Sequence, residues 1–305
     1  MNPIDSLNEE TDTTLSLIKS GFKLGVSIWV AEPETMSFEE NYVKYKACKI
    51  IDESLKTGEE KEIRADSFDF LFIRQDPPFD LKYISNCYLL EAHRNFHKKP
   101  YFVNDPAGIK NFTEKIAPLY FYQLMPDTVI TYSEDILKFM LEKHKNVVIK
   151  PLYLKGGDGI FKISNFDDRN LKKFNDLIKK YNSPVVIQAF VENVKFGDKR
   201  VILLDGKPIG VVNRIPKSGE FKANLHLGGD AKKTKLTTRE RYICDKLKPF
   251  LIYNNLFLVG IDLIDEKLTE INVTSPTGLM QINELYGKDL SIIIWNNLIK
   301  KYRNR

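Results

Sequence analysis

The amino-acid sequence predicts a mixed α/β protein, in which an amino-terminal part with a parallel sheet precedes a longer α+β part with antiparallel hairpins. Two observations support this fold class. Before Asp105, short apolar runs alternate with segments of helical spacing, which is the pattern of a parallel sheet with helical crossovers. Beyond it, Asp205-Gly206 lies between two apolar-rich runs and is a strong signal for a two-residue hairpin turn.

The expected amino-terminal elements follow one another closely along the chain. Residues 12–20 suit a short helix, and the apolar run 23–31 suits a buried strand. Further along, we expect a strand at 68–74, a helix at 83–96 and a strand at 100–105.

The later part of the chain has a different sequence pattern, that of helices mixed with antiparallel hairpins. A helix is expected to begin at Ser133, whose hydroxyl can cap it and whose next two residues are acidic. The other expected elements are a strand at 147–152, a glycine turn with a strand at 156–163, a helix at 169–181, a strand at 184–191, hairpins at 199–216 and 256–273, and helices at 237–253 and 289–302.

Composition and charge indicate an ordinary globular protein rather than a membrane or nucleic-acid-binding one. Of the 305 residues, 43% are hydrophobic and 29% charged, and no apolar run approaches the ~20 residues that span a bilayer. The acidic, polar start of the chain is not expected to be a signal peptide. The net charge of +5 is spread out, without a basic stripe interleaved with aromatic residues. Three widely spaced cysteines argue against disulfides or a zinc site, and we expect a cytoplasmic protein.

The segment GIDLIDEKLTEINVTSP concentrates oxygen ligands on one hairpin. If the turn is centred on Glu266, Asp262 faces Glu270 across the ladder, and Asn272 shares the face of Glu270. Mg²⁺ prefers such hard oxygens together with substrate phosphates. A two-residue turn at 265–266 would instead set Asp262 opposite Thr269 and turn Glu270 to the other face. The plainer alternative is a solvated hairpin face with ordinary acidic residues.

A second candidate is the glycine-rich loop after the strand that ends near Lys150. Gly156-Gly157 and Gly159 allow backbone N–H groups to approach phosphate oxygens, and Lys150 supplies a positive charge. The spacing is not that of a P-loop, and a plain hairpin turn remains the alternative. We expect the segment 154–159 to be mobile without nucleotide, and Lys155 to be dispensable.

Charged residues elsewhere suggest substrate contacts. RQDPPFD, residues 74–80, holds an arginine and two aspartates on a loop that two prolines stiffen, which suits a zwitterionic substrate. A rigid connector with a salt bridge is the alternative reading of this loop. Arg200 and Arg214 flank one hairpin, and arginine suits bidentate binding of carboxylate or phosphate.

The order of these pieces resembles a known family. The resemblance rests on six segments, namely RQDPPFD followed by YLLE, VNDPAGIKNFTEK, VIKPL followed by GG, GDKRVILLDGKPIGVVNRIP, NLHLGGD and VGIDLIDEKLTEINVTSPTG. Together they resemble bacterial glutathione synthetase, an ATP-grasp ligase, over nearly the whole chain. This implies a parallel α/β amino-terminal domain at 1–108, a central ATP-grasp subdomain with the phosphate loop at 109–188 and a carboxy-terminal subdomain with metal and substrate sites at 189–305.

The resemblance also implies roles for single residues. Arg214 would be catalytic, and two Mg²⁺ ions, with Mn²⁺ as the alternative, would bind Asp262, Glu270 and Asn272. ATP would bind Lys115, Lys150, Gly156, Gly157, Gln188, Ala189, Phe190, Val191 and Asp198. The peptide substrate or its phosphorylated form would bind Arg74, Asp76, Arg200, Lys222, Asn224, Ser275 and Thr277.

The implied reaction joins γ-glutamylcysteine to glycine with ATP through an acyl phosphate, in a homotetramer that binds neither nucleic acid nor membrane. Two alternatives remain at this point: another ATP-grasp carboxylate–amine ligase with a different peptide acceptor, or a weakly active nucleotide-binding module. RQDPPFD and NVTSPTG argue against the first, and the intact Asp262, Glu270, Asn272 and Arg214 argue against the second.

Three departures from the family pattern bear on these expectations. The strand that usually precedes the segment matching MNPIDSLN is missing, so we expect a gap or an unpaired edge in the amino-terminal sheet, and we favour a misassigned start. Leu154 stands where a glycine is usual, which bears on the flexibility of the loop. Lys222 stands where an arginine is common, which keeps the charge but loses the bidentate fork.

Overall fold

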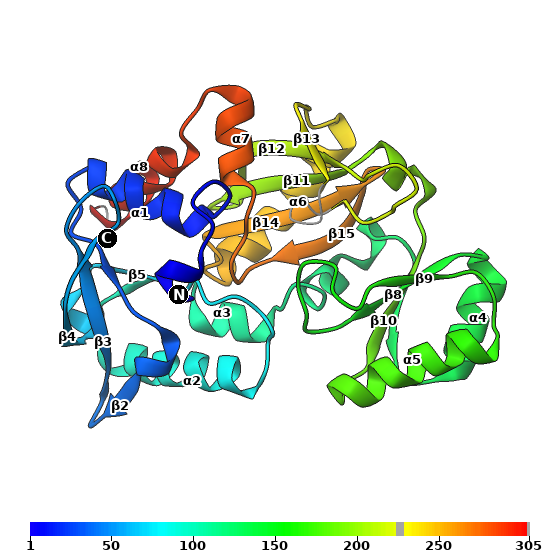
Figure 1. Ribbon diagram of the computed structural model, residues 1–305, viewed down its shortest axis with the longest axis horizontal. Helices are drawn as coiled ribbons and strands as arrows, with labels where there is room; N and C mark the ends of the chain where they lie inside the picture. Colours follow the sequence, from blue (N-terminus) through cyan, green and yellow to red (C-terminus); the bar gives the residue numbers. More distant parts are fainter. Residues whose placement is uncertain (224–228, 304–305) are drawn as a thin grey trace.

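The computed structural model describes residues 1–223 and 229–303 of the chain, and its sheets follow one another along the long axis of the molecule (Figure 1). A four-stranded sheet and a parallel strand pair form the amino-terminal part, a five-stranded sheet lies in the middle, and a second four-stranded sheet forms a lobe at the far end. Within the described residues no helix is long and apolar enough to cross a membrane. Asn224 lies outside the described residues.

The amino-terminal part combines a parallel pair with an antiparallel sheet. β5 (Phe70–Phe72) and β6 (Tyr101–Val103) pair in parallel, as expected, beside α2 (Leu81–Phe96). The other strands, β1 (Trp29–Val30), β2 (Ser37–Glu39), β3 (Tyr42–Ile50) and β4 (Thr57–Arg64), form an antiparallel sheet that we did not predict. The reason is that β4, TGEEKEIR, is largely exposed and polar, so apolar patterning does not mark it. The buried strand expected at 23–31 is reduced to the two half-buried residues of β1.

The expected gap in this part of the fold is present. Within the described chain β5 pairs with β6 alone. Residues of β5 line a cavity of about 790 Å³, together with apolar side chains from α1 (Thr13–Lys23) and α8 (Leu290–Arg303).

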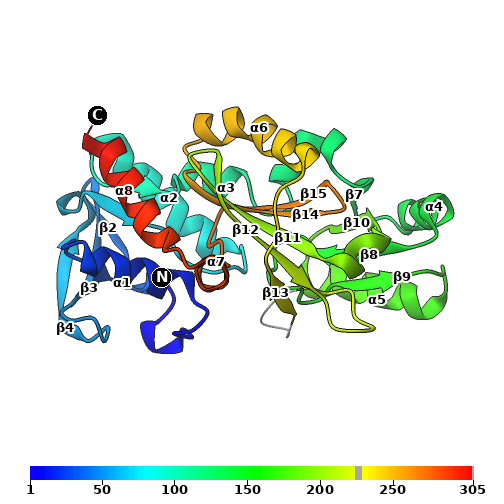
Figure 2. The same cartoon turned by 90° about the horizontal axis from the view of Figure 1, so that it is seen from above.

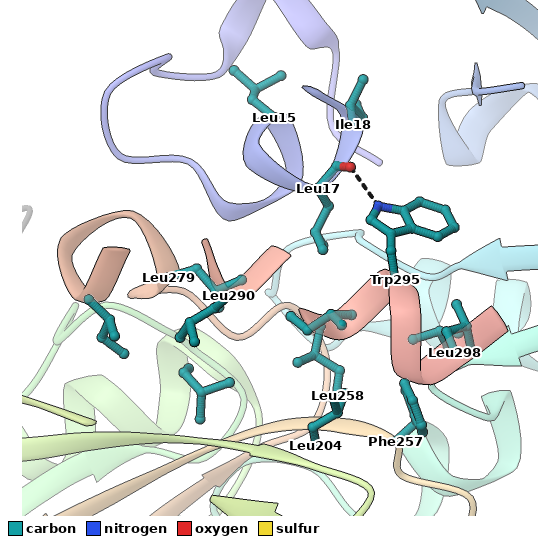
Figure 3. Packing of buried hydrophobic residues seen from close by; sticks show 14 of the residues in the cluster. Leu15, Leu17, Ile18, Leu204, Phe257, Leu258, Leu279, Leu290, Trp295 and Leu298 are labelled. Atoms are coloured by element: carbon teal, nitrogen blue, oxygen red, sulfur yellow. Dashed lines mark hydrogen bonds between the residues drawn. The ribbon is translucent and has the colours of Figure 1, made fainter. Parts of the chain in front are cut away.

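The last helix returns to the amino-terminal part and packs against the first one (Figure 3). Trp295 of α8 donates its indole N–H to the carbonyl of Leu17 of α1 at 2.8 Å. A Cβ at Gly21 would lie only 2.8 Å from this indole ring, so the close approach requires glycine. The same core includes Leu290 and Leu298 of α8, so the two chain ends share one hydrophobic core.

The far lobe is built from β7 (Thr128–Thr131), β10 (Val185–Ala189), β8 (Val147–Pro151) and β9 (Phe161–Ile163), in this order and all antiparallel. α4 (Glu134–His144) and α5 (Asp168–Tyr181) pack on it. α4 begins after Ser133 as predicted, but the cap prediction is wrong in detail. The Ser133 hydroxyl makes no cap hydrogen bond, and its backbone N–H donates to the Thr131 hydroxyl oxygen at 2.9 Å.

The central sheet has the order β13 (Asp230–Lys232), β12 (Lys207–Ile215), β11 (Asp198–Leu204), β14 (Leu258–Ile264) and β15 (Lys267–Asn272). α6 (Thr238–Tyr253) covers one face (Figure 2), and α7 (Leu279–Tyr286) with α8 covers the other. The predicted turn at Asp205-Gly206 is confirmed, since both residues have positive φ. The remaining helical elements are α3 (Pro106–Asn111) and the 3₁₀ helices η1 (Ile4–Ser6), η2 (Pro33–Thr35), η3 (Ala65–Ser67), η4 (Ala117–Leu124) and η5 (Glu192–Phe196).

Candidate active site

A cleft of about 990 Å³ opens between the central sheet, the far lobe and the first residues of the chain. Eighteen of the predicted site residues line it: Asp76, Lys115, Lys150, Gly156, Gly157, Gln188, Ala189, Phe190, Val191, Asp198, Arg200, Arg214, Lys222, Asp262, Glu270, Asn272, Ser275 and Thr277. These residues come from segments that lie far apart in the sequence. The tertiary structure therefore gathers nearly the whole predicted site into one cavity.

The hairpin β14–β15 brings the predicted metal ligands together, but its turn differs from the predicted one. Its turn contains only Asp265 and Glu266, so the expected turn centred on Glu266 is wrong. A bulge between Asp262 and Leu263 on the ladder restores the register, and Asp262 pairs with Glu270 as predicted. Thr269 is the extra residue opposite this step, and its hydroxyl donates to the carbonyl of Asp262 at 3.1 Å.

Asp262 is the anionic centre of a buried ion-pair network. Arg200 donates Nε and Nη2 to its two oxygens at 2.5 and 3.0 Å, and Arg214 Nη2 lies 3.1 Å from Oδ1. Arg214 also donates to Asp198 Oδ2 at 2.5 Å. Burial alone would raise the pKa of Asp262, but the two arginines outweigh it and hold the pKa well below its usual value.

Glu270 faces two lysines instead. Its Oε1 lies 3.6 Å from Lys150 Nζ and 3.9 Å from Lys115 Nζ. Lys115 Nζ also donates to the carbonyl of Leu154 at 2.6 Å, at the start of the glycine loop. Two ammonium groups beside a glycine loop suit the phosphates of a nucleotide.

The oxygens of this patch have the chemistry that a hard divalent cation prefers. In the described part of the chain, however, no three His, Cys, Asp or Glu side chains are placed to hold a metal. Asn272 donates its amide N–H to Asp262 Oδ2 at 3.4 Å. A metal here would therefore need Asp262, Glu270, the amide oxygen of Asn272 and oxygens from a bound ligand.

The base of the cleft in the far lobe is the end of β10. Gln188 is buried and donates its side-chain amide to the hydroxyl of Thr128 at 2.9 Å, which links β10 to the neighbouring strand β7. The N–H of Phe190 donates to the carbonyl of Asn146 at 3.0 Å, and Lys162 Nζ lies 3.9 Å from the centre of its ring. These contacts fix the end of β10 where it borders the cleft.

Comparison with known proteins now identifies the family. A model of the prokaryotic glutathione synthetase ATP-grasp domain matches residues 114–287, and a model of the amino-terminal domain of the same enzymes matches residues 1–110. The chain belongs to the prokaryotic glutathione synthetase family.

Curated members of this family match almost end to end. Glutathione synthetase of Bradyrhizobium diazoefficiens is 39% identical over 99% of this chain and 96% of its own length. The Prochlorococcus marinus enzyme of the same name is 35% identical over 98% of this chain and 97% of its own length. The family expected from the sequence motifs is thus confirmed.

Solved structures confirm the ATP-grasp fold. The ATP-grasp ligase PsnB, complexed with its precursor peptide and AMPPNP, superposes with a TM-score of 0.61 at 12% identity over 95% of this chain and 94% of its own. D-alanine–D-alanine ligase from Bacillus anthracis, complexed with ATP, gives a TM-score of 0.56 at 13% identity over 79% of this chain and 82% of its own.

One predicted substrate residue of this family member lies elsewhere. Arg74 lines the amino-terminal cavity and is not among the residues that line the cleft in the described chain. Asp76, two residues later, does reach the cleft and forms an ion pair with Lys155 of the glycine loop. Both residues follow β5, outside any strand, so strand alternation does not determine where their side chains point.

Two further features of the cleft escaped the sequence reading. The polar amino-terminal segment contributes Asn2, Asn8 and Asp12 to the wall. Glu114 accepts a hydrogen bond from the Thr274 hydroxyl at 3.3 Å, and burial together with Glu270 and Asp262 raises its pKa to about 7 despite Lys115. Neither feature has a local motif, although the position of Glu114 next to Lys115 could have drawn attention to it.

Proposed function

We propose that this chain is an ATP-dependent glutathione synthase that joins γ-glutamylcysteine and glycine, giving glutathione, ADP and phosphate. One observation carries the proposal. The chain belongs to the glutathione synthetase family, and Arg214, Asp262 and Glu270 lie in a single cleft with Lys115 and Lys150, the two lysines beside the glycine loop.

The nucleotide would lie between the far lobe and the central sheet. Lys115, Lys150 and the loop at Gly156-Gly157 would contact its phosphates, and the strand end from Gln188 to Val191 would take the adenine, with Asp198 on the ribose. Asp262, Glu270 and Asn272 would hold Mg²⁺ or Mn²⁺, which would neutralise negative charge on the phosphates.

The chemistry needs a carboxylate, the γ-phosphoryl group of ATP and an amine in one site, with the carboxylate oxygen in line with the bond from phosphorus to ADP. The cysteinyl carboxylate attacks the γ-phosphorus and displaces ADP, and the glycine amine then attacks the acyl carbon and displaces phosphate. Both steps develop negative charge, on the transferring phosphoryl group and on the tetrahedral oxygen. Arg214 would stabilise that charge from a buried position, where water competes little. Arg200, Lys222, Ser275 and Thr277 would orient the peptide and its phosphorylated form.

An acyl phosphate must also be kept away from water. The glycine loop and the residue before it contact the amino-terminal part at two points, which supports a role as a cover. Phe79 N–H donates to the carbonyl of Tyr153 at 3.0 Å, and Lys155 pairs with Asp76. The loop lines the cleft next to the amino-terminal part, and from there it would cover the reacting groups.

The direct test is phosphate release from ATP with γ-glutamylcysteine and glycine, each omitted in turn, with the product identified by mass spectrometry. The full mixture should give stoichiometric phosphate and glutathione, and omission of the peptide should abolish phosphate release. Phosphate release without a product of the expected mass would indicate another acceptor. Absence of phosphate release in every mixture would indicate a nucleotide-binding module and refute the proposal.

A homotetramer and a cytoplasmic location complete the proposal. Light scattering on the purified protein should give about four times the 35.3 kDa of one chain. A mass of one or two chains would refute the tetramer without affecting the proposed reaction.

A further inference from the structure

The segment 273–278 connects β15 to α7 and carries Ser275 and Thr277, which line the cleft. Three of its backbone carbonyls accept hydrogen bonds from buried side chains. Asn104 binds the carbonyl of Val273, Arg74 that of Pro276 and Arg200 that of Thr277. A loop whose carbonyls are tied at three points has little freedom to move.

Asn104 binds the start of this segment through three short hydrogen bonds. Its amide nitrogen donates to the carbonyls of Val273 and Leu258 at 2.7 and 2.8 Å, and its amide oxygen accepts from the N–H of Leu258 at 2.8 Å. Only 2% of the residue is exposed, so no solvent replaces these contacts. Asn104, which follows β6, thus binds the first residue of β14 and the residue that follows β15, in the hairpin that carries Asp262 and Glu270.

Arg74 binds the middle of the segment. Its Nη2 donates to the carbonyl of Pro276 at 3.2 Å, and its Nε donates to the hydroxyl of Thr14 at 3.0 Å. The side chain is 5% exposed and lies outside the cleft lining. Its guanidinium group therefore links the first turn of α1 to the loop, from behind the surface that a substrate would contact.

We propose that Arg74 and Asn104 are positioning residues, which hold the segment 273–278 so that Ser275 and Thr277 face the peptide substrate. This inference rests on the proposed function only for the identity of that substrate. It differs from a direct role for Arg74, because the guanidinium group acts through the Pro276 carbonyl. The effect is expected to be selective, since Arg74 makes its hydrogen bonds to Thr14 and Pro276, away from the glycine loop and β10.

Two kinds of measurement test the inference on the full-length protein. The first is hydrogen exchange of the amides in 274–278 without any ligand, in Arg74→Gln and Arg74→Lys. The second is the KM for γ-glutamylcysteine and for ATP in the same variants. We expect faster exchange in this segment and a KM for the peptide raised by roughly tenfold or more in Arg74→Gln, with the KM for ATP within about twofold. Arg74→Lys should restore part of the loss, because an ammonium group can still donate to the Pro276 carbonyl.

Matched controls separate local from general effects. Arg64→Gln removes a half-exposed arginine from the same part of the chain. Among the carboxylates of the described residues, Arg64 pairs only with Asp66. This variant should leave hydrogen exchange and both KM values unchanged. Asn104→Ala should speed exchange in the same segment, with the exposed Asn111→Ala as its control. If Asn104→Ala fails to fold, the Arg74 variants still decide the question.

Three outcomes would overturn the inference. A raised peptide KM with unchanged exchange would mean that Arg74 contacts the substrate directly. Equal increases in both KM values with a lowered melting temperature would mean a general structural role. Unchanged exchange and unchanged KM values would mean no role. Because the exchange measurement uses no substrate, it also decides the positioning of the loop if the wild-type protein proves inactive with γ-glutamylcysteine and glycine.

Discussion

Asp262 lies directly opposite Glu270, although only two residues, Asp265 and Glu266, turn the chain between their strands. Both turn residues have positive φ, as a tight hairpin of this length requires. Without a correction, such a turn would pair Asp262 with Thr269 and direct Glu270 to the opposite face. The bulge at Thr269 absorbs one residue, and so the two carboxylates share the cleft.

Arg214 is the residue whose loss should reduce turnover most. Arg214→Ala is expected to lower kcat about a hundredfold, corresponding to roughly 3 kcal/mol, because its contacts strengthen as charge develops. Arg214→Lys should rescue poorly, since a single ammonium group cannot replace both the Nη2 contacts with Asp198 and Asp262 and the Nε hydrogen bond to the Asp198 carbonyl. Steady-state kinetics with all three substrates saturating provide the measurement. The exposed Arg239→Ala serves as the control, and near wild-type turnover in folded Arg214 variants would contradict the assigned role.

Asp262 should be required both for stability and for metal binding. Asp262→Asn removes the anion between two buried guanidinium groups, and such a break costs about 3–5 kcal/mol in other buried pairs. We therefore expect a lower free energy of unfolding in urea at pH 7. Electron paramagnetic resonance should also show that Mn²⁺ binding with a non-hydrolysable ATP analogue is strongly weakened. Unchanged Mn²⁺ affinity would remove Asp262 from the proposed metal site.

Glu114 should make stability depend on pH. Its pKa is raised in the folded protein to about 7, so the ionised form opposes folding. The penalty is absent below the unfolded pKa of about 4.3, grows as the pH rises, and is fully present above pH 7. Glu114→Gln should therefore be more stable than the parent at pH 8, by about 3–4 kcal/mol, and similar near pH 4. Urea unfolding at both pH values, with the exposed Glu53→Gln as control, is the measurement, and a pH-independent difference would argue against this shift.

Lys155 is expected to be dispensable, as the resemblance to the family implies. The ion pair with Asp76 is half-exposed, and such pairs are worth at most about 1 kcal/mol. Lys155→Ala should therefore change kcat/KM by less than about fivefold. Lys172→Ala, on the exposed face of α5, is a suitable control. A loss of two orders of magnitude would show that Lys155 does more than pair with Asp76.

The glycine loop at 154–159 should be mobile in the free protein and protected by nucleotide. Its glycines adopt positive φ, and its side chains contribute little to the buried core. We expect rapid hydrogen exchange of these amides without ligand and slower exchange with an ATP analogue and Mg²⁺. Equal protection in both states would argue against a covering role.

Local sequence signals predicted local structure well. The turn at Asp205-Gly206 and the helix that begins after Thr237 depend on residues within a few positions of each other, and both are present. The hairpin of Asp262 and Glu270 was expected for the same reason. Its bulge was not, because the position of an extra residue depends on how both strands pack in the finished sheet.

The sequence by itself determined the family and the ATP-grasp fold, and nearly all the site residues that it predicted line the cleft, because oxygen ligands, glycines and basic residues appear in a recognisable order. Only the tertiary structure decided their partners. Arg200 meets an aspartate 62 positions away, and Arg74 binds a carbonyl 202 positions away rather than lining the cleft. Side-chain direction and burial decide such contacts, and both arise when distant segments pack together, which leaves no local pattern in the chain.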